Sequence, residues 1–126
     1  DRPDMFKEAE GVRKDMAEFI DPLAELARDV EKLTKEIGLK AMLNHNEVGA
    51  AAVPYLRVMG HLVYAYLFAR MAKVALTHKK SGDTFYQAKL ATARFYFARL
   101  LPEASYQMQL VRAGEASLMS LDAALF

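Results

Sequence analysis

The chain has 126 residues, no cysteine, 53% hydrophobic residues and a formal net charge of +1. This length fits one domain, residues 1–126, with enough apolar residues to bury a core without metal or disulfide support. The lack of cysteine excludes disulfides, thiolate metal sites and thiol nucleophiles, and the small net charge argues against nucleic acid as a partner.

The two parts of the chain differ in charge. Residues 1–47 carry 8 Lys or Arg and 12 Asp or Glu, whereas residues 48–126 carry 9 and 4. The simplest interpretation is an acidic helix lying against a more basic remainder within one fold. A basic face offered to an external anion is the less favoured alternative.

A seam of apolar or small residues marks the first third as helical. The seam advances by alternating steps of four and three, the pattern of a helix packed nearly parallel to its neighbours. Pro22 falls inside the pattern and should kink the axis. One kinked helix and two nearly collinear helices would both keep the seam on one side. The seam residues are Met5, Ala9, Val12, Met16, Phe19, Leu23, Leu26, Val30, Leu33 and Ile37.

A second long helix is expected to begin near Asn44, because Asn44 and Glu47 have the spacing of a capping box. It is apolar on most faces, which predicts the central helix of a bundle. Pro54 should lie near its start or bend it. The polar residues 77–83, including Gly82, then predict a turn.

A third helix should start at Thr84, where Gln87 again has capping-box spacing. Its apolar pattern continues beyond Pro102, so we expect a helix that bends there and goes on. The bend would direct residues 95–101 at one layer and residues 104–118 at another. The expected inward positions are Leu90, Ala93, Phe97, Leu100, Ala104, Met108, Val111 and Leu118.

These elements predict an all-α fold, an up-and-down bundle of long, proline-kinked helices. There are three long helices, or four or five if the chain is broken at Pro22, Pro54 and Pro102. Period-two alternation of β-branched residues is absent, so no strand is expected. Charged residues interrupt the longest apolar stretch, residues 53–76, and no membrane span is expected. We expect a cytoplasmic location, since the charged start does not read as a signal peptide.

No pattern of catalytic, cofactor-binding or metal-binding residues is recognisable. The six glycines stand alone, so there is no phosphate-binding loop, and the three histidines lack the Glu-x-x-His spacing of di-iron bundles. Paired carboxylates such as Glu25 and Asp29 have the pattern of a solvated helix face. The prediction is therefore a fragment without catalytic residues, cofactor or metal.

Four residues are candidates for an interface or pocket: Tyr55, His61, Arg94 and Tyr96. His61 is the one histidine on an apolar helix, and burial with hydrogen bonds is favoured over a ligand or proton-transfer role. For Arg94, a stem packed on aromatic rings with its head paired to the acidic first helix is favoured over an anion site. Phe95, Tyr96 and Phe97 span most of a helix circumference, so at least one should face another layer or a partner.

Three segments, in order and spacing, resemble the C-terminal domain of a long subclass of acyl-CoA dehydrogenases. These are PYLRVMGHLVYAYLFARMA (54–72), FYQAKLATARFYFARLLPEASYQ (85–107) and AGEASLM (113–119). The resemblance covers roughly residues 50–122, and the acidic first helix is similar only in kind. The region from His61 to Tyr66 departs from the family, which often has glycine and tryptophan there.

The resemblance implies a non-catalytic helical bundle that packs on the dehydrogenase core and supports subunit association and stability. The parent enzyme would oxidise fatty acyl-CoA to 2,3-enoyl-CoA with FAD and a glutamate, both in the preceding core. The start without Met agrees with a C-terminal fragment of a larger chain. Its partners would be the remainder of the dehydrogenase and a second subunit.

Two other functions stay open at this point. One is a free-standing helical interaction module that uses the seam of residues 5–37 as its binding face. The other is a bundle that binds an acyl or CoA moiety between helices near Tyr55, His61 and Arg94.

Overall fold

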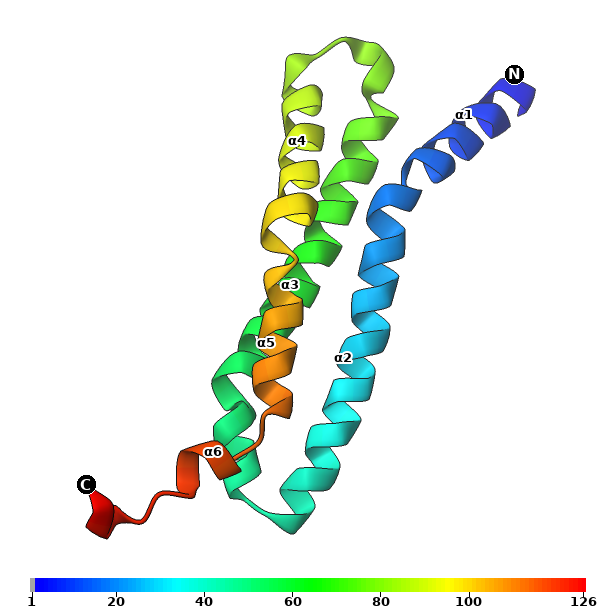
Figure 1. Cartoon of the computed structure of the whole chain (residues 1–126). Helices are drawn as coiled ribbons and strands as arrows, with labels where there is room; N and C mark the ends of the chain where they lie inside the picture. The colour runs from blue at the N-terminus through cyan, green and yellow to red at the C-terminus, as the bar shows by residue number, and fades with distance from the viewer. Residues whose placement is uncertain (1) are drawn as a thin grey trace.

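The computed structural model describes residues 2–126, and over that range it contains helices and turns but no strand. Three antiparallel rods run the length of the molecule: α2, then α3, then α4 continued by α5 (Figure 1). This arrangement confirms the predicted all-α up-and-down bundle. The α-helices are α1 (Arg2–Asp15), α2 (Ala17–Leu43), α3 (Asn46–Thr77), α4 (Thr84–Phe95), α5 (Glu103–Arg112) and α6 (Ala116–Met119).

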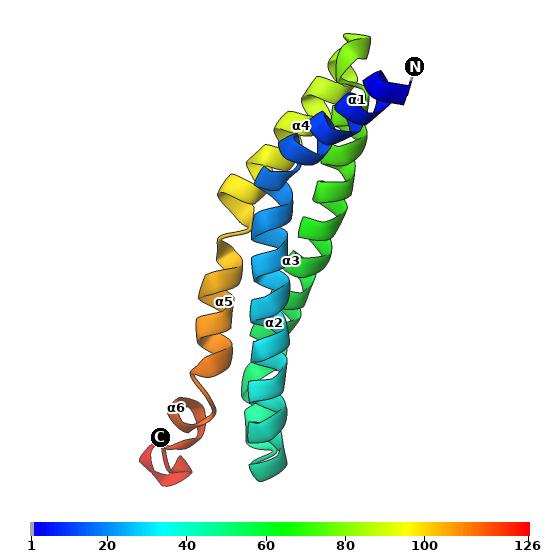
Figure 2. The same ribbon diagram turned by 90° about the vertical axis from the view of Figure 1, so that its right-hand side faces the viewer.

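The first third forms two helices, and the break lies at Met16 rather than at Pro22. Pro22 is inside α2, where its ring removes the N–H that would bond the Glu18 carbonyl and crowds that oxygen. The distortion therefore falls in the first turn of α2, next to the break. Beyond it, α1 inclines away from the bundle axis (Figures 1 and 2).

The predicted seam is buried where α2 packs on the bundle. Met16, Phe19, Leu26, Val30 and Leu33 are buried. Leu23 and Ile37 are partly buried against the same core. Met5, at the far end of α1, is 69% exposed because α1 has left the bundle. The seam therefore holds α2 in place but is not fully covered along α1.

α3 is the central helix, as predicted, and it contacts α2, α4 and α5. It runs through Pro54 without a break. Most of its buried positions are alanines, which allow the neighbouring helices to come close. The buried residues of α3 are Ala51, Val58, Ala65, Ala69, Ala72, Ala75 and Leu76.

Both predicted helix starts are correct to within two residues, but neither capping box forms. The Asn44 side chain accepts from the Asn46 N–H and donates to Glu115 Oε1, while the Asn44 N–H bonds the Lys40 carbonyl. Glu47 instead lies beside Gly114, which has φ +78° and ends α5. At the other turn, where Gly82 takes φ 70°, Asp83 rather than Thr84 caps α4 by accepting from the Phe85 N–H. Asn44 thus caps through the Asn46 N–H without Glu47, whereas Asp83 replaces Thr84 at the second turn.

The third rod bends before Pro102, as expected. Residues Tyr96–Leu100 form a π-helical turn, and the Leu101 N–H bonds the Tyr96 carbonyl at 2.9 Å, five residues back. Pro102 lacks an N–H, so the regular hydrogen-bond pattern stops, and α5 resumes at Glu103. The bend between α4 and α5 is visible in both views (Figures 1 and 2).

The π-turn changes which residues point inward. Tyr96 and Leu101 are buried, whereas Leu100, predicted to be inward, is 47% exposed. The wider turn accommodates one extra residue, so positions five apart share a face there. Ala93, Ala104, Met108 and Val111 are buried as predicted, but Leu118 is 67% exposed because the helix has ended at Gly114.

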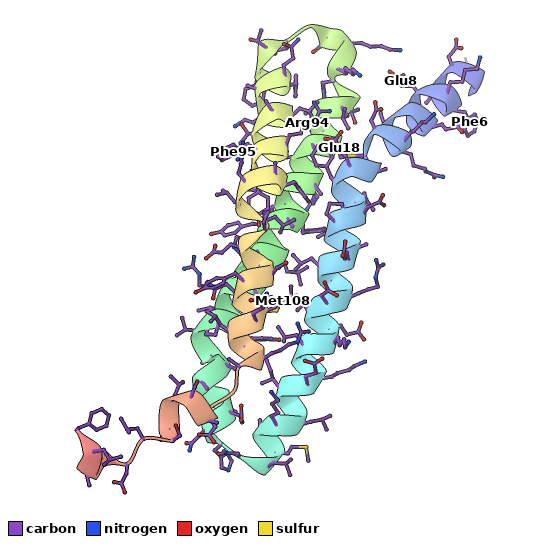
Figure 3. The ribbon with its side chains drawn as sticks, viewed as in Figure 1. Phe6, Glu8, Glu18, Arg94, Phe95 and Met108 are labelled. Atoms are coloured by element: carbon purple, nitrogen blue, oxygen red, sulfur yellow. The ribbon has the colours of Figure 1, made fainter. Side chains whose placement is uncertain are left out.

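The core is divided along the length of the bundle into two clusters. One, around Phe19, Leu76 and Ala93, joins α2, α3 and α4. The other, around Leu33, Val58 and Met108, joins α2, α3 and α5. The expected division is wrong in detail, because Tyr96 and Leu101 belong to the second cluster together with Ala104, Met108 and Val111. Phe97 packs against both clusters, so the change from one to the other falls at the π-turn itself. Met108 points toward α2 in Figure 3.

Ion pairs connect the acidic first third to the basic remainder, which confirms the interpretation drawn from the charge distribution. Arg94 Nε lies 2.7 Å from Glu18 Oε1 (Figure 3), and Arg112 Nε lies 2.9 Å from Glu36 Oε2. Lys79 and Lys80, in the turn between α3 and α4, pair with Asp15 and Glu8 of α1. These pairs are exposed, so we expect each to contribute little to stability by itself.

Leu33 offers the sharpest test of the core, because its side chain is 0% exposed. Replacing Leu33 with alanine leaves a cavity and should cost about 2–5 kcal/mol of unfolding free energy. Leu39, on the same helix, is 67% exposed, so Leu39→Ala should change it by less than about 0.5 kcal/mol. Urea unfolding followed by circular dichroism measures both. Equal losses in the two variants would contradict this packing.

Candidate functional site

The main polar cluster of the bundle joins α3 to the start of α5, directly across the Pro102 bend. His61 Nε2 lies 2.8 Å from Glu103 Oε2, and Gln107 Nε2 donates to Glu103 Oε1 at 3.1 Å. Arg57 donates to the same Oε1 through Nε, at 3.0 Å, and through a terminal nitrogen. On the other side of the ring, His61 Nδ1 lies 2.9 Å from the Tyr96 hydroxyl. We call Arg57, His61, Tyr96, Glu103 and Gln107 the polar clamp.

Each member of the clamp is placed by local structure. Arg57 and His61 are four residues apart on α3 and so share one face of that helix. Glu103 is the first residue of α5, where a carboxylate also interacts favourably with the helix dipole. Tyr96 opens the π-turn, and its ring stacks on Phe68 with centroids 4.5 Å apart. Because the helix breaks at Pro102 and restarts at Glu103, the Glu103 carboxylate lies against α3.

The hydrogen bonds indicate where the protons of the clamp lie. The Tyr96 hydroxyl donates to the His61 carbonyl at 3.1 Å, so its single proton is used there. The phenol oxygen can then accept from His61 Nδ1, and the Glu103 carboxylate can accept from His61 Nε2. Glu103 is an anion in contact with the Arg57 guanidinium and the His61 ring, both on α3.

The same contacts account for two shifted pKa values. Hydrogen bonds from His61, then from Arg57 and Gln107, lower the pKa of Glu103 from 4.5 to about 2. Burial raises the pKa of the Tyr96 hydroxyl from 10.0 to about 12, and the nearby Tyr64 and Glu103 add to the shift. Both groups stay in one protonation state across the physiological range: Glu103 is ionised and Tyr96 is neutral.

A hollow of about 330 Å³ lies over the clamp. Its lining is Arg57, Gly60, His61, Tyr64, Tyr96, Leu100 and Glu103. The carboxylate, imidazole and phenol are already bonded to one another, and no buried polar side-chain atom among the described residues lacks a partner. Nor do residues 2–126 contain a group of three His, Asp or Glu side chains placed to hold a metal ion. Chemically, the arrangement is suited to fixing α5 against α3.

Of the four candidate residues from the sequence, the structure brings together His61 and Tyr96. Tyr55 lies elsewhere, its hydroxyl 2.6 Å from the Thr34 hydroxyl on α2. Arg94 forms a two-point ion pair with Glu18, the structural role that the sequence favoured. Phe95 is 57% exposed and points away from the bundle (Figure 3), so the three aromatics do not share one core, and a partner at Phe95 stays a prediction.

Sequence reasoning missed Arg57 and Glu103. A signal for Glu103 was present, because an acid directly after a helix-breaking proline occupies the first turn of the next helix. The signal for its partner was His61, a polar ring on an apolar helix that needs a hydrogen bond when buried. What could not be read from the sequence was that these two residues lie at the same height in the bundle.

Comparison with known proteins identifies the family. The model described as "Acetyl-CoA dehydrogenase C-terminal like" matches residues 4–122. The chain belongs to this family, the C-terminal domain of acyl-CoA dehydrogenases. The match begins at residue 4, so the acetyl-CoA dehydrogenase C-terminal-like domain includes the acidic first helices as well as the segments after residue 50.

A curated relative gives the same result. The broad-specificity linear acyl-CoA dehydrogenase FadE5 of Mycobacterium tuberculosis (strain ATCC 25618 / H37Rv) is 31% identical over 85 residues. The aligned part is 64% of this chain and 14% of the relative. The acetyl-CoA dehydrogenase C-terminal-like domain thus spans a small fraction of that enzyme's length. No helix between residues 2 and 126 is long and apolar enough to cross a membrane.

Stability at acid pH should report on the clamp. Because the pKa of Glu103 is lower in the folded state, its contribution is present above about pH 4.5 and is lost as the pH falls toward 2. Glu103→Gln removes this titration, so the variant should lose less stability than the parent between those values. Urea midpoints measured across that pH range test the expectation. Glu31→Gln, in an exposed pair with Lys35, is the control and should keep the parental pH dependence.

Tyr96→Phe should destabilise the bundle by about 1–3 kcal/mol, because it leaves His61 Nδ1 and the His61 carbonyl without their phenol partner. The ring and its stacking on Phe68 are kept. Tyr106→Phe, at an exposed position on α5, should change the unfolding free energy by less than about 0.5 kcal/mol. Thermal and urea unfolding measure both. Indistinguishable variants would show that the phenol contributes nothing to the clamp.

Proposed function

We propose that this bundle is the non-catalytic C-terminal domain of an FAD-dependent acyl-CoA dehydrogenase, which oxidises fatty acyl-CoA to 2,3-enoyl-CoA. In this proposal the domain packs on the remainder of the enzyme and supports subunit association and stability, and the enzyme is cytoplasmic. The observation that carries the proposal is the family match over residues 4–122, combined with the 14% share of the relative that this chain aligns with.

The residues of this chain do not suit a flavin. The clamp holds the main set of converging polar groups, and its arginine and histidine already bond Glu103. The glycines are isolated, so no phosphate-binding loop is formed. We therefore assign FAD and the reacting groups to the rest of the enzyme, and this domain to positioning and assembly.

The two rival functions are less well supported. The seam of residues 5–37, proposed as the binding face of a free-standing module, is buried or partly buried within the bundle from Met16 to Ile37. The proposed acyl or CoA site needs Tyr55, His61 and Arg94 together. Instead, these residues contact Thr34, Glu103 and Glu18 respectively.

The proposal predicts that the chain exists in cells as part of a larger protein. An antibody raised against the bundle, used on a denaturing immunoblot of source cells, should detect a band several times heavier than 14.1 kDa. A band at 14.1 kDa would refute the dehydrogenase assignment.

The role in assembly is tested by experiments on that larger protein. Removing the segment that corresponds to residues 4–122 should lower its mass in light scattering or its thermal stability. If mass and stability both stay the same, the assembly role is wrong even though the family is right.

A further inference from the structure

A second apolar stripe runs along the face of α3 opposite its buried alanines. Its members advance by alternating steps of three and four, so they share one side of the helix. The aliphatic members are between 50% and 71% exposed. We call this surface the outer stripe. It consists of Val53, Leu56, Gly60, Val63, Leu67, Arg70 and Val74.

The bundle's own packing does not account for the outer stripe. The fully buried positions of α3 are mostly alanine, and Leu62 and Phe68 are partly buried on the same inner side. The aliphatic residues of the outer stripe are at least half exposed. Their exposure shows that no helix among residues 2–126 covers them. Single exposed aliphatic side chains are common on proteins, but a continuous row of them marks an interaction surface.

Gly60, at the middle of the stripe, supports this interpretation independently. A Cβ added at Gly60 would meet nothing within 4 Å, so the fold of this chain does not require glycine there. Glycine inside a helix costs about 1 kcal/mol relative to alanine. A residue with no side chain at the centre of an exposed apolar row allows another backbone to approach closely.

The charge around the stripe restricts the partner. Residues 48–82 contain no Asp or Glu, whereas Arg70 lies in the stripe and Lys73 lies beside it. Within the described part of the chain, neither Arg70 nor Lys73 forms an ion pair with a carboxylate. The guanidinium of Arg70 lies 5.8 Å from the centre of the Tyr66 ring. An acidic partner would supply the missing counter-charges.

The same charges argue against a second copy of this chain. The stripe extends from Val53 to Val74, so an antiparallel pair would place Arg70 of one copy near Arg57 of the other. A parallel pair would place Arg70 against Arg70. The parallel arrangement brings two guanidinium groups together, which is unfavourable. In the antiparallel arrangement the facing Arg57 already holds Glu103, so that carboxylate is engaged within its own copy.

We propose that the outer stripe binds an amphipathic helix whose apolar seam has the same three–four spacing and whose flanks carry Asp or Glu. The helix belongs to the dehydrogenase region of the same enzyme, an assignment that rests on the function proposed above. Attachment in one chain gives such a helix a high effective concentration, so even a modest intrinsic affinity is sufficient. The outer stripe is the surface through which the domain joins the enzyme.

The test uses the 126-residue chain and two synthetic helical peptides as long as the stripe. Both peptides carry the same leucine seam in three–four spacing, but one has glutamates on its flanks and the other has lysines. Fluorescence anisotropy should show the glutamate peptide binding at least about tenfold more tightly. Arg70→Glu should reduce that preference. Equal binding of both peptides, or no binding of either, would overturn the proposal.

The double variant V63D/L67D should weaken binding of the glutamate peptide at least about tenfold. The matched control is L39D/M42D, two exposed apolar residues three apart on α2, which should bind like the parent. Circular dichroism shows whether each variant folds, and Val63→Ser with Leu67→Ser gives a milder pair. Unchanged binding by folded stripe variants would overturn the proposal. Self-association of the parent that the stripe variant abolishes would show that a second copy occupies the surface, which also overturns it.

The full-length enzyme separates this inference from the proposed function. If deleting the whole domain lowers the assembled mass or stability but V63D/L67D does not, the outer stripe is not the contact and the assembly role stands. If the deletion changes neither, the assembly role fails. Binding of the glutamate peptide would then still identify the stripe as a helix-binding surface, but not as one for the dehydrogenase region.

Discussion

The contact of Glu103 with His61 and Arg57 holds the two halves of the third rod in their relation to α3. Where a proline interrupts the helical hydrogen bonds, those bonds no longer fix the direction of the next helix. Without another contact, α5 could move away from α3. A carboxylate held by Arg57 and His61 on one face of α3 fixes the first residue of α5. Once that residue is fixed, Ala104, Met108 and Val111 can reach the core. An uncompensated charge at this place would be costly, so the clamp acts only as a complete set.

Acidic and basic side chains are used differently at the inner and outer faces of the bundle. The carboxylates of α1 and α2 are drawn to Lys79, Lys80, Arg94 and Arg112, which join the acidic first third to the rest of the chain. The outer side of α3 carries Arg70, aliphatic groups and exposed tyrosine rings. The near-neutral total charge of the chain therefore conceals a surface of one sign. The distribution agrees with a domain whose exposed central helix is completed by another part of an assembly.

The sequence was sufficient for the parts of the fold that depend on periodicity. The apolar seam from Met16 to Ile37 and the polar interruptions near Asn44 and Gly82 could be read directly, because helical spacing and turn chemistry are local properties. The caps were less accessible: Asn44 was predicted, but it accepts from the Asn46 N–H without help from Glu47, and Asp83 caps α4 in place of Thr84. The position of the first break was missed for a similar reason: Pro22 is the visible breaker, but its effect falls on the carbonyl four residues earlier.

The polar clamp could be predicted only in part, because it depends on how far two distant helices are shifted along each other. His61 and Tyr96 stood out as polar or aromatic groups in apolar surroundings, whereas Glu103 resembled any first-turn acid. Tyr55 and Arg94 had the same chemical character as the clamp residues, yet they bond to Thr34 and Glu18 on α2. Residue type thus indicated which side chains need a hydrogen bond. Which partner each one bonds depends on the register of α3 against α5.

The π-turn has a consequence for comparing members of the family. Tyr96–Leu100 contains one residue more than an α-helical turn of the same rise, so a relative could lack that residue and still present the same faces of α4 and α5. An alignment without a gap at this turn would then pair most buried positions of α5 with a less buried neighbour, Gln107 and Met108 being the consecutive exception. Two closely related domains would look as though their interiors had diverged, although they differ by a single residue in one wide turn. Sequence identity after Tyr96 is therefore meaningful only once the length of this turn has been established in each protein.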